Sequence, residues 1–152
     1  MQIRRLVTGT DDRGQAVVSA DGAAPVAFTV QAGDAACIVT ELWCADAAPP
    51  PLAGPDPTLG RREADMNLGP GVVRWRTVEF PPGAGRVPFF HATPTLDLGV
   101  VVSGEIDLLL DDGSRTRLNA GDTFVQRATN HAWQNNGTVP CVLMTVVLGC
   151  AT

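Results

Sequence analysis

The stretch GRVPFFHATPTLDLGVVVSG, residues 85–104, decides how the rest of the chain is interpreted. If this stretch is extended, alternation with a period of two places four polar side chains on one face: His91, Thr93, Thr95 and Asp97. The residues that alternate with them after position 95 are apolar. A face of one imidazole, two hydroxyls and one carboxylate does not suit a core, so we expect it to meet water or to line a polar cavity.

A second stretch, GDTFVQRATNHAWQN at residues 121–135, contains the only other histidine of the chain, His131. Trp133 is two positions from His131, so in an extended strand it faces the same side and adds an aromatic wall beside the second imidazole. We expect Gln126 to point inward beside His131, where it either contacts a substrate, orients the imidazole or satisfies a backbone group.

Around these stretches the chain reads as short strands separated by turn signals, with no persuasive helical period. Gly, Asp and Asn punctuate runs that are rich in Val, Ile, Thr and aromatic residues. Such regular spacing is typical of an all-β sandwich or barrel. The expected strands cover residues 3–9, 15–19, 27–31, 37–43, 72–80, 95–102, 105–110, 115–118, 123–127, 131–134 and 139–148.

Two further features leave alternatives open. Residues 45–70 are rich in Pro and show no period, which fits a mobile surface loop or a lid over a site. Glu41 shares parity with Val39 and Trp43, and we interpret it as a charge on an edge strand rather than as an inward acid.

Composition excludes several functions. The chain has 152 residues, which fits one domain over residues 1–152, and its net charge is −5. It contains no Lys and no Tyr, which excludes Schiff-base chemistry and a phenolic general acid. Its 11 basic residues are scattered, with no run longer than the pairs Arg4-Arg5 and Arg61-Arg62, so we expect neither nucleic acid nor a membrane surface as a partner. No stretch resembles a secretory signal or a membrane span, and the four Cys suit buried positions, so we expect a cytoplasmic protein.

Residues 82–135 resemble the two conserved motifs of the cupin superfamily. The first motif begins at Gly85 and reaches His91 after five residues. Thr93 stands where the motif has a second His, Asp97 stands in its Glu position, and Gly104 closes it. The resemblance implies a single-domain jelly-roll β-barrel of the cupin type.

The second cupin motif opens at Gly121 and closes with His131 and Asn135. Arg127 and Thr129 replace its Pro and Gly, and the stretch before His131 is one residue short. Cupins of this size often dimerise through N-terminal strands, so the resemblance also implies a homodimer.

Cupin metal sites typically use three His and one Glu, and this chain retains counterparts of only three of these ligands. His91, Asp97 and His131 would form a 2-His-1-carboxylate set suited to Fe, Mn or Zn, and Thr93 replaces the remaining ligand. Whether a divalent metal binds is therefore left open.

The leading hypothesis is a lyase or isomerase that uses acid–base chemistry inside the barrel. Dehydration, decarboxylation, isomerisation or cyclisation of a carbonyl compound would need groups that titrate near neutral pH. The candidate catalytic residues are His91, Asp97, His131 and Gln126, and the candidate substrate contacts are Thr93, Thr95, Trp133, Trp75 and Phe89. A polyketide-like substrate from secondary metabolism is implied by the resemblance alone. The alternatives are a metal-dependent oxygenase on the three-ligand set and a non-catalytic module that binds a small molecule.

Overall fold

The computed structural model describes residues 2–61 and 68–151, and its regular structure is entirely β. Each of the eleven expected strands is present, with ends that shift by up to four residues, because apolar alternation and turn residues agree along the chain. The strands are β1 (Arg4–Thr10), β2 (Ala16–Ala23), β3 (Val26–Ala32), β4 (Ala35–Ala45), β5 (Val73–Phe80), β6 (Thr95–Ser103), β7 (Glu105–Leu110), β8 (Arg115–Asn119), β9 (Thr123–Arg127), β10 (His131–Gln134) and β11 (Cys141–Gly149).

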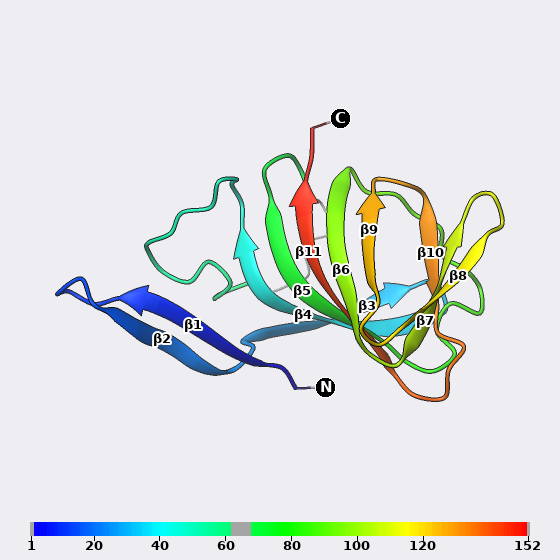
Figure 1. The fold of residues 1–152 in the computed structure, drawn as a ribbon, viewed down its shortest axis with the longest axis horizontal. Coiled ribbons are helices and arrows are strands. Elements are labelled where there is room, and N and C mark those ends of the chain that lie inside the picture. The colour runs from blue at the N-terminus through cyan, green and yellow to red at the C-terminus, as the bar shows by residue number, and fades with distance from the viewer. Residues whose placement is uncertain (1, 62–67, 152) are drawn as a thin grey trace.

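Two antiparallel sheets enclose the interior. The larger sheet has six strands in the order β3-β4-β5-β11-β6-β9, and the smaller has three in the order β10-β7-β8. The larger sheet curves toward the smaller one, and together they form a barrel (Figure 1). Side chains of alternate residues on these strands therefore face a shared interior.

Within the described residues, the hairpin of β1 and β2 pairs only with itself, and it projects from the side of the barrel (Figure 1). Arg5 fastens it, because its Nη1 donates to the Leu42 carbonyl at 3.0 Å and its other terminal nitrogen pairs with Asp56. The apolar side chains of Leu6 and Val18 remain more than half exposed on the hairpin.

Residues 46–61 lack regular structure but are tied to the barrel. Asp46 accepts from both Arg61 and Arg74, with shortest distances of 2.8 and 2.7 Å. The buried Thr58 hydroxyl accepts a hydrogen bond from the Cys44 amide. The expected surface loop is therefore anchored as far as residue 61, and residues 62–67 lie outside the described part of the chain.

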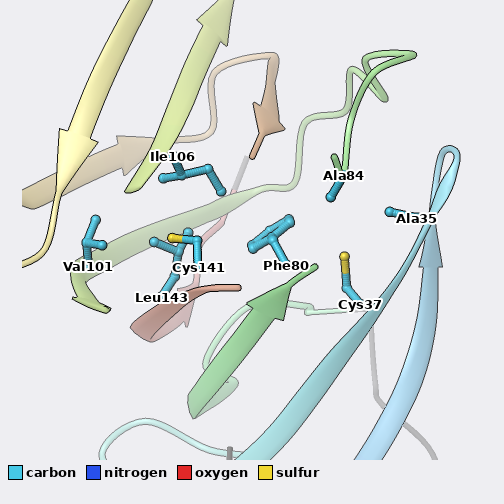
Figure 2. Close-up of a cluster of buried hydrophobic side chains, with 8 residues drawn as sticks. All are labelled: Ala35, Cys37, Phe80, Ala84, Val101, Ile106, Cys141 and Leu143. Carbon is cyan, nitrogen blue, oxygen red and sulfur yellow. The ribbon is translucent and has the colours of Figure 1, made fainter. Parts of the chain in front are cut away.

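An apolar cluster fills one end of the barrel. Phe80 lies between side chains contributed by both sheets (Figure 2). The cluster comprises Ala35, Cys37, Phe80, Ala84, Val101, Ile106, Cys141 and Leu143. Burial raises the pKa of the Cys37 and Cys141 thiols to about 11, so both behave as small apolar groups, as the sequence suggested.

Candidate active site

The barrel interior holds a cavity of about 430 Å³, a size suited to a small organic ligand. Its walls come from both sheets and are mostly apolar at the end formed by the cluster of Figure 2. Polar side chains gather in the remaining wall. They are Gln31, Arg76, His91, Thr93, Asp97, Gln126, His131 and Thr145.

His91 and His131 are neighbours in this wall. They form an isolated antiparallel bridge in which each backbone amide donates to the other's carbonyl at 3.0 Å. Their ring centroids lie 4.5 Å apart and the rings are tilted by 48°. The two histidines found in the sequence therefore meet in one site, although 40 positions separate them along the chain.

The hydrogen bonds of the two rings define which nitrogen carries the proton. His91 Nδ1 lies 3.2 Å from the Phe89 carbonyl, and His131 Nδ1 lies 2.9 Å from the Thr129 carbonyl. A carbonyl oxygen only accepts, so Nδ1 must be the donor in both contacts. In the neutral ring, Nε2 then keeps its lone pair and can act as a base.

Burial favours the neutral form of His131, which is 4% exposed. Desolvation lowers the pKa of His131 below 6.5, and the neighbouring charge of His91 acts in the same direction. The Thr129 hydrogen bond and the charge of Asp97 oppose this shift. His131 is therefore the better candidate for a general base near neutral pH.

Gln126 contacts the turn whose Thr129 carbonyl accepts the hydrogen bond from His131 Nδ1. Its Nε2 donates to the Thr129 carbonyl at 2.9 Å and also contacts the Thr129 hydroxyl. Ala128, in the same turn, adopts the left-handed backbone region with φ of 51°. Gln126 lines the cavity, and its side chain donates to the same carbonyl that accepts from His131 Nδ1. This bond satisfies a backbone group, one of the alternatives expected for Gln126, and it connects the side chain to His131.

Asp97 belongs to the same wall, but it does not orient either imidazole. Its Oδ1 is buried and has no hydrogen-bond partner in the described part of the chain. Desolvation raises the pKa of Asp97 above 3.8, while a hydrogen bond from Thr95 and the charges of His131, Arg76 and His91 lower it. Asp97 lines the cavity, but its Oδ1 is enclosed by the protein.

The two threonines of the first motif take different positions. Thr93 lines the cavity in the place of the missing histidine. Thr95 is 2% exposed and lies behind it, with the two hydroxyl oxygens 2.8 Å apart. Thr95 does not line the cavity, so its expected substrate contact was wrong, and its structural partners are Thr93 and Asp97.

Two aromatic rings flank the histidines. Phe89 stacks on His91 with centroids 5.3 Å apart, and Trp133 meets His131 edge-on at 5.9 Å. Both line the cavity, as expected from the sequence. These rings offer flat apolar surfaces beside the imidazoles.

Arg76 and Glu41 form a buried ion pair that sequence reasoning missed. They are register partners on β5 and β4, with Nη2 to Oε1 at 2.7 Å and Nε to Oε2 at 3.3 Å. Arg76 lines the cavity, and Glu41 is 1% exposed, so its interpretation as an edge-strand charge was wrong. The matching parity of an acid and a base on adjacent strands is the signal that could have revealed the pair.

Trp75 lies on the outer face of the larger sheet, so its expected substrate contact was wrong. Its neighbour Arg76 points into the cavity, and successive side chains of a strand face opposite ways. Trp75 instead lines a separate outer groove. Phe124 and Thr145 line both hollows.

Other motif residues support the backbone around the site. Gly85 has a φ of 75°, and a Cβ there would collide with the carbonyl of Trp133. The buried Asn135 donates to the carbonyls of Phe80 and Val139, both at 3.0 Å, and accepts from the Gly137 amide. Their motif positions thus reflect folding requirements.

The described residues do not fit the metal site implied by the resemblance. Across residues 2–61 and 68–151, no group of three or more His, Cys, Asp or Glu is arranged to hold a metal ion. The expected set of His91, Asp97 and His131 is therefore not assembled. Asp is one methylene shorter than Glu, and the Thr93 hydroxyl is a poor ligand for transition metals.

Comparison with known proteins identifies the family. The profile described as "Cupin domain" matches residues 76–147. The "Cupin-domain-containing oxidoreductase fogC" of Aspergillus ruber is 31% identical over 154 residues, covering 98% of this chain and 73% of that protein. The chain belongs to the cupin family.

Other relatives match over shorter stretches. The "Cupin-domain-containing oxidoreductase srdD" of Neurospora crassa is 41% identical over 78 residues, which cover 49% of this chain and 39% of the relative. The "Oryzines biosynthesis cluster protein J" of Aspergillus oryzae is 43% identical over 70 residues, which cover 46% and 37%. This chain thus spans less than two fifths of the length of either relative.

Solved structures confirm the fold. The EutQ protein of Clostridium difficile superposes with a TM-score of 0.55 over 97% of both chains at 10% identity. At that identity the superposition shows a shared fold and says nothing about activity. A search of the described residues for a helix long and apolar enough to cross a bilayer finds none.

Proposed function

We propose that the protein is a small-molecule enzyme of the lyase or isomerase type, acting on an apolar carbonyl compound in the barrel cavity. One observation carries the proposal: two neighbouring imidazoles, each with Nδ1 bound to a backbone carbonyl, stand in the wall of a largely apolar cavity. Such a pair can both accept and deliver protons near neutral pH.

In this proposal, His131 Nε2 takes the proton from the carbon next to the substrate carbonyl. When His91 carries a second proton, it delivers that proton to the departing hydroxyl, so the substrate loses one water molecule. The ring centroids are 4.5 Å apart, so the proton can then return from His131 to His91. The flanking rings of Phe89 and Trp133 would hold an apolar substrate against the pair.

The first step, removal of the proton from the carbon next to the carbonyl, can be tested without the natural substrate. We expect the protein to catalyse exchange of the methyl protons of acetophenone in heavy water, followed by NMR. His131→Ala should slow the exchange by about 10²–10⁴-fold, the range typical of a positioned general base. Asn130→Ala is a matched control, because its side chain binds the exposed Asp111.

Two outcomes would contradict the proposal. Exchange that persists in folded His131→Ala would show that His131 is not the general base. A bound probe with no exchange above the solvent rate would instead favour a non-catalytic binding module.

A second candidate, an oxidoreductase, is favoured by the name of the relative that matches 98% of this chain. It predicts stoichiometric metal or another redox cofactor in the purified protein. Metal analysis of the wild type beside His91→Ala and His131→Ala tests it. Acetophenone exchange that survives a chelator would support the first candidate over a metal-dependent one.

A further inference from the structure

The cavity has two chemically different ends. One end is the polar wall that holds both histidines. The other, here called the apolar end, is lined by Ala35, Cys37 and Ala84, each at most 6% exposed. These three side chains lie together on one side of Phe80 (Figure 2). The apolar end is therefore enclosed by small side chains that carry no charge.

The two ends lie about 13 Å apart. On β4, Cys37 precedes Glu41 by four residues, and the ion-pair partner of Glu41 belongs to the polar wall. Ala84 accepts a hydrogen bond from the Asn135 amide at 2.9 Å, and Asn135 follows His131 by four residues. A strand rises by about 3.3 Å per residue, so each of these steps spans about 13 Å. A ligand that reaches both ends must be extended.

The cavity meets solvent beside the polar wall. Phe89 lines the cavity, its ring stacks on His91, and the residue is 51% exposed. A substrate whose carbonyl group stays at the histidines then has the buried apolar end for the rest of its carbon skeleton. A polar group placed there would lose its hydration without an equivalent partner, which disfavours any tail that is not apolar.

Small side chains create the room at the apolar end. Ala35 and Cys37 are alternate residues of β4 and line the cavity, whereas Ala36 between them is exposed on the opposite face. Ala84 adds another methyl group from the segment between β5 and β6. Protein interiors are closely packed, so a longer side chain at any of the three lining positions would occupy space that a ligand could use.

We infer that the substrate carries an extended apolar tail that lies in the apolar end, and that Ala35, Cys37 and Ala84 determine how long this tail can be. The inference rests on the proposed function, because it places the carbonyl group at His91 and His131. It adds the shape of the substrate and the residues that select it.

Binding of straight-chain methyl ketones tests the inference without any turnover. The series has tails of three to eleven carbons, and isothermal titration measures each affinity. We expect the wild type to gain about fourfold in affinity per methylene group until the tail fills the apolar end, and to gain nothing beyond that length. Ala35→Leu should bring this limit to a tail about two carbons shorter, and affinity for ketones below the new limit should stay unchanged.

Two further variants complete the test. Ala36→Leu makes the same change one position along β4, on an exposed residue, and should keep the wild-type limit. Cys37→Ala removes the sulfur from the apolar end and should move the limit to a longer tail, so it decides the question if Ala35→Leu does not fold. An unchanged limit in the folded variants at positions 35 and 37 would overturn the inference, as would wild-type affinity that does not rise with tail length.

The same series separates this inference from the proposed proton transfer. A limit that moves as expected without acetophenone exchange would keep the tail site and reject the proton transfer. Exchange that depends on His131, with no rise in affinity along the series, would keep the proton transfer and reject the tail site.

Discussion

His91 and His131 are joined through their backbones as well as through their rings. The paired amide–carbonyl bonds of 3.0 Å hold the two residues in register, and this register brings their ring centroids to 4.5 Å. The relative position of the imidazoles is therefore determined by β-bridge geometry. A site of this kind is preorganised before any ligand enters.

His131 should titrate below the usual histidine range. Burial lowers its pKa from 6.5, so the neutral base should persist when the pH falls below that value. NMR titration of the ring protons can follow this directly, because the chain has only two His. The resonance that remains in His91→Ala belongs to His131, and a midpoint above 6.5 would contradict the expectation.

The same shift has a consequence for stability. The unfolded chain takes up a proton at His131 near pH 6.5, before the folded protein does. His131 therefore contributes to stability above that pH, and the contribution is lost as the pH falls toward the lower pKa of the folded state.

Asp97→Asn should stabilise the protein at neutral pH. The pKa of Asp97 is raised above 3.8 by burial, so ionisation is less favourable in the folded state than in the unfolded chain. Stability is therefore lost as the pH rises from 3.8 through the folded pKa, and Asn avoids this loss. Thermal unfolding should show a gain on the order of a few degrees at pH 7 that vanishes below pH 3.8. A gain that is the same at all pH values would point to packing instead.

Gln126→Leu should impair the chemical step more than binding. Without the donor to the Thr129 carbonyl, the turn that orients His131 loosens. We expect acetophenone exchange at saturation to fall by about tenfold, while probe affinity changes by less than about twofold. Gln126→Glu keeps the length and polarity of the side chain but cannot donate when ionised, so it should lose as much exchange activity as Gln126→Leu. Full activity in Gln126→Glu would show that donation is not required.

Glu41→Leu should be strongly destabilising, because it leaves the Arg76 charge buried and without its carboxylate. Breaking a buried ion pair from one side typically costs about 3–5 kcal/mol. The double variant Glu41→Leu with Arg76→Met removes both charges and should recover most of that loss. Chemical denaturation of the wild type, the single variant and the double variant measures the free energy of unfolding of each. A double variant no more stable than the single one would argue against the ion pair.

The homodimer implied by the family resemblance stays a prediction. The β1–β2 hairpin exposes 52% of Leu6 and 57% of Val18, and a lone two-stranded hairpin is at best marginally stable. Light scattering should therefore give the mass of two chains, and Leu6→Ser with Val18→Ser should give one. Thr8→Ser on the same hairpin should remain a dimer, and a monomeric wild type would refute the expectation.

The sequence was sufficient to predict the strands and the two histidines of the site. Local alternation and turn residues specify each strand, and these signals lie within short stretches of chain. That His91 and His131 share one barrel was implied by the resemblance to the two cupin motifs, and the structure brings the two residues together.

The errors concern which face of a strand points inward. Alternation in β5 allows either face of the strand to point inward, and the apolar Trp75 suggested the wrong face. Arg76 could occupy the interior only because Glu41 lies opposite it on β4. That compensation depends on strand register between distant segments, which no local pattern reports.

The ring of Phe124 lies against Gly99, its register partner on the neighbouring strand of the larger sheet. Gly99 has no side chain, and a Cβ at that position would collide with this ring. Phe124 lines both the inner cavity and the outer groove. The two positions therefore constrain each other: a side chain larger than hydrogen at position 99 requires a smaller one at 124.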